Sequence, residues 1–436
     1  MEKQKKVKIS KKTYLIIFLL FVLTIISNAD KAVIGYASVP IMEELGLTSE
    51  QWGMVGSSFF FLYSLFAILI GALADRVGLK KVIAGMATVW ALVQFATVFV
   101  TGYLYLLITR IVLGAGEGPS YSLAMAAASR YLPKEKLGLG LTLVSIGGPF
   151  GVAISAPVLM YLIFNYGWRS AFIATGIVGI IWVVLWLMFV KEKTINDNQT
   201  SAETAGQASG GNRTADFAES KFSSALFSKN FIFIALCGFA TYWSFTVGLN
   251  WLPNYLENVR GLSEATLSLV VSLPWIMITL SQLFFSTLSD RIYLNTRDIV
   301  KSRVFVLGPV MAAGGVSYII GNLIQSNILA VTLLSLGLTF GCITLVLGPA
   351  ILVSLVSEEH QGKIQGWFMA ITSLGGIVGP YVTGYLVEHS ATMAAGFQSA
   401  FIICGAILLI FGGLVWIAVR PKNVEVPKDL MKVSSE

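Results

Sequence analysis

The stretch GALADRVGLKK at residues 71–81 is a short charged interruption between two long apolar runs. Residues 51–70 before it and 82–101 after it contain no Asp, Glu, Lys or Arg. An apolar run of about 20 residues is long enough to cross a lipid bilayer as a helix. The stretch therefore predicts a loop at a membrane surface that joins two transmembrane helices.

The rest of the chain repeats this pattern. Of its 436 residues 56% are hydrophobic and 12% are charged, whereas soluble domains carry about 25% charged residues. We therefore predict an all-α integral membrane protein of twelve transmembrane helices. The predicted spans are 14–36, 51–73, 82–101, 104–128, 138–163, 171–190, 230–256, 266–288, 304–323, 328–356, 364–387 and 396–419.

The positive charges predict the orientation of these helices. The net charge is +7, and 26 of the 30 Lys and Arg residues lie in the two tails and in alternate loops. Such a bias marks the cytoplasmic side of a membrane protein. Both termini are therefore expected in the cytoplasm, and nucleic-acid binding is not needed to explain the basic composition.

The chain divides into two halves around a polar segment. Residues 191–229 are rich in Ser, Thr, Ala, Gly and Asn, a composition that cannot bury enough apolar surface to fold alone. We predict an N-terminal six-helix bundle (1–190), a cytoplasmic linker (191–229), a C-terminal six-helix bundle (230–420) and a cytoplasmic tail (421–436).

The two halves also repeat each other. STLSDR (286–291) matches GALADR (71–76), and SLGGIVG (373–379) matches SIGGPFG (145–151). Each pair occupies corresponding places in the two predicted bundles. Transporters built from two such repeats bind their substrate between the halves, near the middle of the bilayer.

Charged residues inside the predicted spans are candidates for the site. They are Asp30, Lys31, Arg110 and Glu117. Inserting a charged side chain at the centre of a lone membrane helix costs about 2.5–3.5 kcal/mol, so the presence of each of these residues needs a functional or structural explanation. With a rise of 1.5 Å per residue, Asp30 and Arg110 reach the same depth and Glu117 lies about 10 Å deeper. We expect the four to face one cavity.

This cavity would suit an anion and a proton. Arg110 and Lys31 can bind a carboxylate, and the planar guanidinium of Arg110 can do so with two hydrogen bonds. A proton taken up by Asp30 or Glu117 would keep the loaded site near neutral. The alternative interpretation is a set of buried ion pairs that only fixes helix packing.

The C-terminal half has no comparable interior charge, and its polar side chains could bind substrate hydroxyls. We favour Asn250 and Ser373 among a wider set of Tyr242, Asn250, Trp251, Gln282, Gln365, Trp367 and Ser373. Enzymatic groups are not apparent. The three cysteines lie in apolar spans without metal-ligand spacing, and the two histidines fall in loops on opposite sides of the predicted membrane. We expect no enzyme, no metal and no cofactor other than the proton as coupling ion.

At this point the motifs resemble those of a known family. GALADRVGLKK matches the signature G-x-x-x-D-R-x-G-x-K/R-K/R of the major facilitator superfamily at every fixed position. The resemblance implies a conformational clamp at the ends of neighbouring helices. Its residues would be Gly71, Asp75 and Arg76, with Asp290 and Arg291 in the repeat.

Three further motifs resemble the anion:cation symporter family within it, which includes bacterial proton-coupled sugar-acid importers, sialin and the vesicular glutamate transporters. They are NADK (28–31), R-x6-E-G (110–118) and GWRSAF (167–172). This resemblance implies that Asp30 and Glu117 are proton sites, that Lys31 and Arg110 contact the anion, and that Tyr63 contacts substrate. The family usually has Arg in place of Lys31, and often Asn in place of Ser373.

These observations predict a monomeric, multi-pass protein of the cell membrane. It would import an organic carboxylate with protons by alternating access, with a hexonate or hexuronate as the expected substrate. One alternative is a proton-coupled antiporter that exports drugs or metabolites, because GGPFG (147–151) faintly resembles the helix-five motif of such exporters. Arg110 argues against cationic drugs, which an acidic site without a partnered Arg would favour. Another is a membrane sensor that binds the anion without moving it, although no tail or linker is large enough for a partner-binding domain.

Overall fold

The computed structural model describes residues 11–132, 137–191, 222–357 and 360–421, and in these residues all regular structure is helical. The N-terminal half contains α1 Lys11–Tyr36, α2 Ser38–Leu45, α3 Ser49–Ser58, α4 Tyr63–Val77, α5 Leu79–Val98, α6 Tyr103–Glu117, α7 Ser120–Tyr131, α8 Leu137–Tyr166 and α9 Trp168–Phe189. The C-terminal half contains α11 Lys229–Asn258, α12 Glu264–Val270, α13 Leu273–Thr296, η3 Val300–Val304, α14 Phe305–Leu323, α15 Asn327–Gly341, α16 Thr344–Leu352, η4 Val353–Leu355, α17 Gln361–His389 and α18 Met393–Ala418. The predicted all-helical membrane fold is confirmed.

Eleven segments of the described chain are long and apolar enough to cross a membrane. They match eleven of the predicted spans, and the remaining one, 104–128, is present as two consecutive helices, α6 and α7. The helix is interrupted at Gly118 and Pro119. Pro119 has no N–H to continue the helical hydrogen bonds, and a Cβ on Gly118 would collide with the backbone of Tyr63. A close approach between α6–α7 and the start of α4 therefore accompanies the break.

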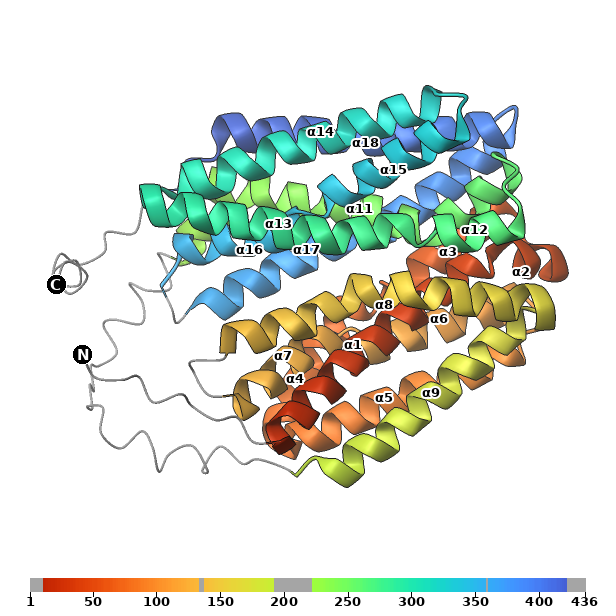
Figure 1. Cartoon of the computed structure of the whole chain (residues 1–436), viewed down its shortest axis with the longest axis horizontal. Coiled ribbons are helices and arrows are strands. Elements are labelled where there is room, and N and C mark those ends of the chain that lie inside the picture. Colours follow the sequence, from red (N-terminus) through yellow and green to blue (C-terminus); the bar gives the residue numbers. More distant parts are fainter. Residues whose placement is uncertain (1–10, 133–136, 192–221, 358–359, 422–436) are drawn as a thin grey trace, which may run out of the picture.

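The helices form two groups that lie side by side (Figure 1). Helices α1 to α9 make up one group and α11 to α18 the other. Residues 192–221 of the predicted linker and residues 422–436 of the predicted tail lie outside the described residues. Within each group the contacting faces are apolar and buried, as in Trp90, Trp186, Phe397 and Phe401.

The halves meet closely at the end of the molecule where α1 ends, which we call the Tyr36 end. There α3 runs along α17 and α1 touches α11. A Cβ on Gly53 would lie 3.1 Å from the Cα of Tyr381, and a Cβ on Gly35 would collide with the carbonyl of Leu249. Small residues let two helix backbones approach each other in this way. We call this glycine-lined contact the seam.

Side-chain hydrogen bonds reinforce the seam. Glu388 of α17 accepts a hydrogen bond from the backbone N of Ser49, at 2.8 Å, where α3 begins. Tyr381 donates its hydroxyl proton to Glu50 at 3.0 Å. A carboxylate at a helix N-terminus is favoured by the helix dipole. Polar bonds between the two halves therefore add to the close backbone contact at this end.

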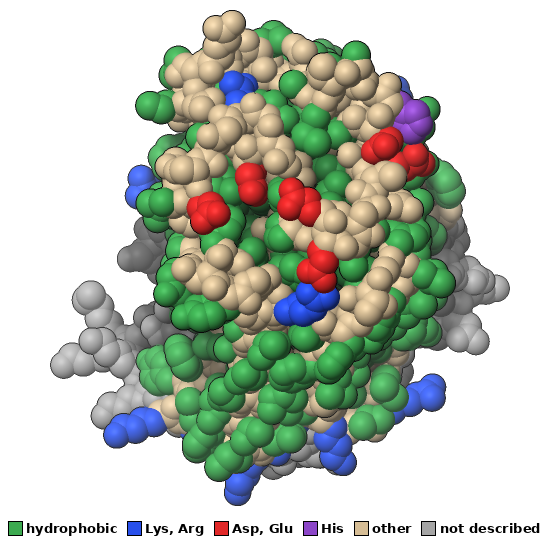
Figure 2. All heavy atoms as spheres, turned by 90° about the vertical axis from the view of Figure 1, so that its right-hand side faces the viewer, with side chains coloured by type: hydrophobic (Ala, Val, Ile, Leu, Met, Phe, Trp, Pro, Cys, Tyr) green, Lys and Arg blue, Asp and Glu red, His purple; other side chains and the backbone are tan. Residues whose placement is uncertain are grey.

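Acidic side chains gather on the Tyr36 end, as Figure 2 shows. One of them, Glu44 of α2, pairs with Arg169 at the start of α9, with 2.6 Å between Oε1 and Nη2. Trp168 donates a further hydrogen bond to the same carboxylate at 2.7 Å. The hydrogen bond from Arg169 holds the pKa of Glu44 below its usual value. The Tyr36 end corresponds to the predicted outer side, and the orientation itself stays a prediction.

Candidate functional site

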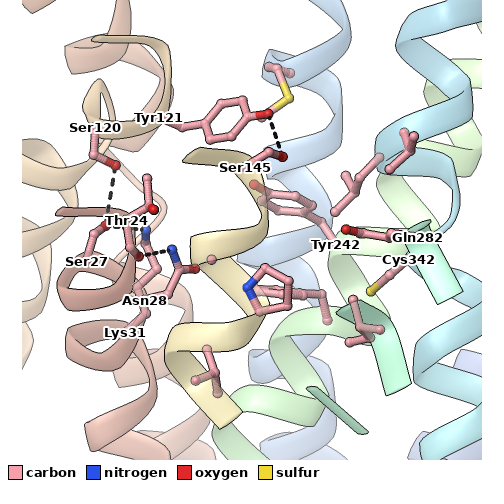
Figure 3. A pocket seen from close by; sticks show the side chains of 18 of the residues that line it. Thr24, Ser27, Asn28, Lys31, Ser120, Tyr121, Ser145, Tyr242, Gln282 and Cys342 are labelled. Atoms are coloured by element: carbon pink, nitrogen blue, oxygen red, sulfur yellow. Dashed lines mark hydrogen bonds between the residues drawn. The ribbon is translucent and has the colours of Figure 1, made fainter. Parts of the chain in front are cut away.

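A cavity of about 180 Å³ lies between the two halves (Figure 3). The N-terminal half contributes Thr24, Ser27, Asn28, Lys31, Phe60, Tyr63, Ser120, Tyr121, Ser145, Gly148, Pro149 and Val152. The C-terminal half contributes Tyr242, Phe245, Ile278, Gln282, Cys342, Leu345, Val346 and Met369. The N-terminal wall is mostly polar and the C-terminal wall mostly apolar. A cavity shared by both halves is where an alternating-access transporter holds its substrate.

Lys31 is the charged residue that faces the cavity. Its Nζ lies 3.1 Å from Oε2 of Glu117 and donates a hydrogen bond to Oγ of Ser27 at 2.9 Å. Ser27 in turn donates to the same Glu117 oxygen at 3.2 Å. Ser27 and Lys31 are four residues apart in α1 and so share a face of that helix. The three side chains form a closed triangle of hydrogen bonds.

The two charges of this triangle differ in their access to the cavity. The side chain of Lys31 is 11% exposed and lines the wall, whereas that of Glu117 is fully buried behind it. Oε1 of Glu117 has no hydrogen-bond partner among the described atoms. A ligand in the cavity can therefore reach Lys31 but not the carboxylate that neutralises it.

Tyr63 also lies in the cavity wall. The Nζ of Lys31 is 5.9 Å from the centre of its ring, within the range of a cation–π contact. The ring packs against Phe60, which in turn meets Tyr242 of the other half with 5.9 Å between ring centres. The sequence-based assignments of Lys31 and Tyr63 as substrate contacts therefore concern residues that a ligand can touch.

Asp30 does not share this cavity. Its carboxyl is buried and faces Gln94 of α5 and Thr175 of α9. Neither Oδ1 of Asp30 nor either amide atom of Gln94 completes a hydrogen bond with a described atom. Adjacent residues on a helix point about 100° apart, so α1 turns Lys31 toward the cavity and Asp30 into the bundle. The expectation that all four charged residues face one cavity was wrong on this point.

Arg110 is likewise buried away from the cavity wall. Its guanidinium carbon lies 5.2 Å from the centre of the Phe59 ring. Its nearest charges are the carboxylates of Glu117 and Asp30. In this arrangement Arg110 is positioned to balance buried carboxylates and cannot form a direct contact with a ligand in the cavity.

Asn250 and Ser373 are buried where the halves touch and do not line the cavity. The backbone carbonyl of Asn250 accepts a hydrogen bond from Trp52 of α3 at 3.5 Å. The hydroxyl of Ser373 lies 2.6 Å from that of Ser64 in α4. In the C-terminal half the polar groups that reach the cavity are instead Tyr242 and Gln282, which the sequence offered only among a wider set.

The clamp residues are only partly described. The side chain of Asp75 lies outside the described residues, Arg76 is exposed, and a Cβ on Gly71 would have no neighbour within 4 Å. In the repeat, Asp290 pairs with Arg303 of η3 at 2.6 Å, while Arg291 is exposed. The pair ties the end of α13 to the start of the next membrane segment. Sequence reasoning missed Arg303 because no motif marks it.

The sequence is similar to those of known membrane transporters. The family model described as Major Facilitator Superfamily matches residues 20–347 and 298–435. The chain is 29% identical to the hexuronate transporter of Bacillus subtilis, over 93% of this chain and 94% of that protein. It is 31% identical to a probable sulfoacetate transporter of Cupriavidus necator, over 94% of each chain.

Solved structures show the same fold. A bacterial homologue of the human lysosomal transporter Spinster, in an inward-facing and unoccupied conformation, superimposes with a TM-score of 0.77 at 16% identity, covering 94% of this chain and 98% of that one. A D-xylose–proton symporter gives a TM-score of 0.73 at 17% identity, covering 94% and 99%. This chain is thus a multi-pass membrane transporter, not an enzyme, and it belongs to the major facilitator superfamily.

Proposed function

We propose that the protein is a proton-coupled symporter that takes up an organic carboxylate. One observation carries the proposal: Lys31 faces the cavity while the carboxylate that neutralises it, Glu117, is buried directly behind it at 3.1 Å. An anionic substrate and Glu117 therefore compete for the same ammonium group. Protonation of Glu117 removes the competitor.

This competition gives an order of events. In the empty carrier at high pH, Glu117 is ionised, so Lys31 stays paired with it and attracts an anion weakly. When Glu117 takes up a proton, the ammonium of Lys31 becomes an uncompensated charge in a partly desolvated site, and a substrate carboxylate replaces the lost partner. When the substrate leaves, the unpaired Lys31 favours release of the proton. Anion and proton thus bind and leave together.

Asp30 and Arg110 support this exchange from inside the bundle. We assign Asp30 as a second proton site, since it is buried against an amide that can hydrogen-bond to either of its protonation states. Arg110 lies near both carboxylates and stabilises whichever is ionised. The resemblance-based role of Arg110 as a direct anion contact would require it to move away from Phe59.

The relatives support a small organic anion as substrate. Their names include hexuronate, sulfoacetate and galactarate/D-glucarate transport. We propose a sugar acid, a hexonate or hexuronate, carried inward by a monomer whose termini lie in the cytoplasm. The hydroxyl groups of Ser27, Ser120, Tyr121 and Ser145 on the N-terminal wall can hydrogen-bond the hydroxyls of such a molecule.

Proton movement driven by substrate tests the proposal. Purified protein is reconstituted in proteoliposomes with a pH-sensitive dye outside, and a sugar acid is added without any imposed gradient. Symport predicts alkalinisation of the outer medium that depends on the substrate and is abolished in Lys31→Gln. Acidification would indicate an antiporter. Tight binding with no proton movement and no uptake of labelled substrate would indicate a sensor.

A further inference from the structure

We propose that the cavity selects organic anions with one negative charge and turns their less polar face toward the C-terminal half. The inference rests on the proposed function and narrows its substrate class. It excludes dianions, such as aldarates and dicarboxylates, as preferred substrates. It follows from how charge and polarity are distributed over the two walls.

The positive charge comes from one place. Among the described residues that line the cavity, Lys31 is the one Lys or Arg. The second interior cation, Arg110, is 3% exposed, lies over the Phe59 ring and has two carboxylates as its nearest charges. Protonation of Glu117 therefore frees a single cationic group for the ligand. One carboxylate can be neutralised there.

The opposite wall cannot neutralise a second carboxylate. Six of its eight lining residues are apolar or nearly so: Phe245, Ile278, Cys342, Leu345, Val346 and Met369. The other two, Tyr242 and Gln282, are uncharged. Burying an ionised carboxylate without a charged partner is far more costly than burying a hydroxyl. A hydroxymethyl or methyl group at that end of the ligand avoids this cost.

The shape of the wall also favours an apolar face. The rings of Tyr242 and Phe245 are stacked, with 5.7 Å between their centres, and line the cavity together with Ile278 and Met369. Apart from Tyr242, the hydroxyl-bearing side chains lie on the facing wall of the N-terminal half. In Figure 3, Gln282 and Cys342 stand across the cavity from Ser27, Asn28 and Lys31. A ligand is therefore oriented with its carboxylate and most hydroxyls toward α1.

Matched pairs of anions test this selectivity in proteoliposomes. Each pair differs in one terminal group that is a carboxylate in one member only: gluconate and glucarate, galactonate and galactarate, butyrate and succinate. Each anion is tested for substrate-driven alkalinisation and as a competitor of the best labelled substrate. We expect the monoanion of every active pair to compete at least about 10-fold better than its dianion.

The two possible failures are distinguishable. If none of the anions causes alkalinisation or uptake, the proposed function falls and this inference falls with it. If anions are transported with protons but dianions compete equally well or better, the function stands and the inference is overturned.

A gain of function makes the test sharper. Gln282 of α13 lies in the C-terminal wall, and an arginine there would reach further into the cavity than the glutamine it replaces. Gln282→Arg adds a second cation opposite Lys31, so the ratio of monoanion to dianion competition should fall at least about 10-fold. The matched control is Gln282→Met, which keeps the side-chain size and should leave the preference for monoanions intact. The melting temperature of Gln282→Arg shows whether the variant is folded. If it equals that of the wild type and the ratio of monoanion to dianion competition is unchanged, this wall does not determine charge selection.

Discussion

Replacing Glu117 by Gln tests the coupling mechanism directly. The substitution imitates a permanently protonated carboxyl. At 3.1 Å from Lys31, the ionised carboxylate contributes about 5 kcal/mol of direct attraction if the effective dielectric constant is about 20. Much of this attraction is offset, because water in the cavity screens the pair and because burying the ionised carboxylate is itself costly. We expect at least about 1.4 kcal/mol to remain, which is about 10-fold tighter anion binding at alkaline pH.

Binding measured against pH, together with two transport assays on the same preparation, checks this expectation. In the wild type, anion affinity should fall up to about tenfold per pH unit once Glu117 becomes ionised, because the proposed mechanism takes up one proton at Glu117 with each anion. In Glu117→Gln this dependence should shrink to the part that Asp30 contributes. Exchange of labelled for unlabelled substrate should persist, while accumulation driven by a proton gradient falls to near background.

The refuting result is equally specific. If Glu117→Gln binds the anion more weakly and loses exchange and accumulation to the same degree in folded protein, Glu117 serves as a packing partner of Lys31. Glu264→Gln is the control, since Glu264 is an exposed carboxyl in the first turn of α12. That variant should match the wild type in all three measurements.

Three further predictions concern packing, charge and topology. Gly114→Ala should lower the melting temperature of purified protein by several degrees, because its Cβ would collide with the α3–α4 turn and overpacking costs about 1–3 kcal/mol; Gly413→Ala, with open space around it, should not. Glu44→Gln should cause a small loss of thermal stability near neutral pH, since the lowered pKa of Glu44 stabilises the fold above its usual titration range. This difference should shrink as the pH falls below that range and vanish once Glu44 is protonated in the folded protein; a difference that does not change with pH would exclude the pair with Arg169 as its cause. A cysteine replacing Ser201 should resist an impermeant thiol reagent in intact cells, because the surrounding loop is predicted to be cytoplasmic. Ready labelling would contradict the predicted topology.

The sequence predicted the helices well because the bilayer imposes their length and polarity. Apolar runs of about 20 residues have few other solutions in a lipid environment. The predicted span 104–128 shows what hydropathy does not detect. The break at Pro119 depends on a local steric effect and on Gly118 touching the backbone of Tyr63, and a Gly-Pro pair inside an apolar run was the available signal.

The site was predicted less completely, for geometric reasons. Counting residues along α1 and α6 placed Asp30 and Arg110 at one depth, but depth does not determine the direction in which a side chain points. Asp30 and Lys31 are neighbours on a helix and point about 100° apart, and of the two only Lys31 lines the cavity. Asn250 and Ser373 lie on helix faces that touch the other half, and sequence patterns do not show how two bundles are docked.

The seam has a consequence for how the resting balance between conformations is adjusted. Because Gly35, Gly53 and Gly384 bring backbone against backbone, these three positions place no side chain of their own between the halves at the Tyr36 end. Separation there must break polar bonds, such as that from Ser49 to Glu388, and must withdraw the buried side chain of Trp52 from α11. A single added methyl group at one of these glycines would wedge the contact open. Such a change would alter turnover and apparent affinity together while leaving every side chain of the cavity in place.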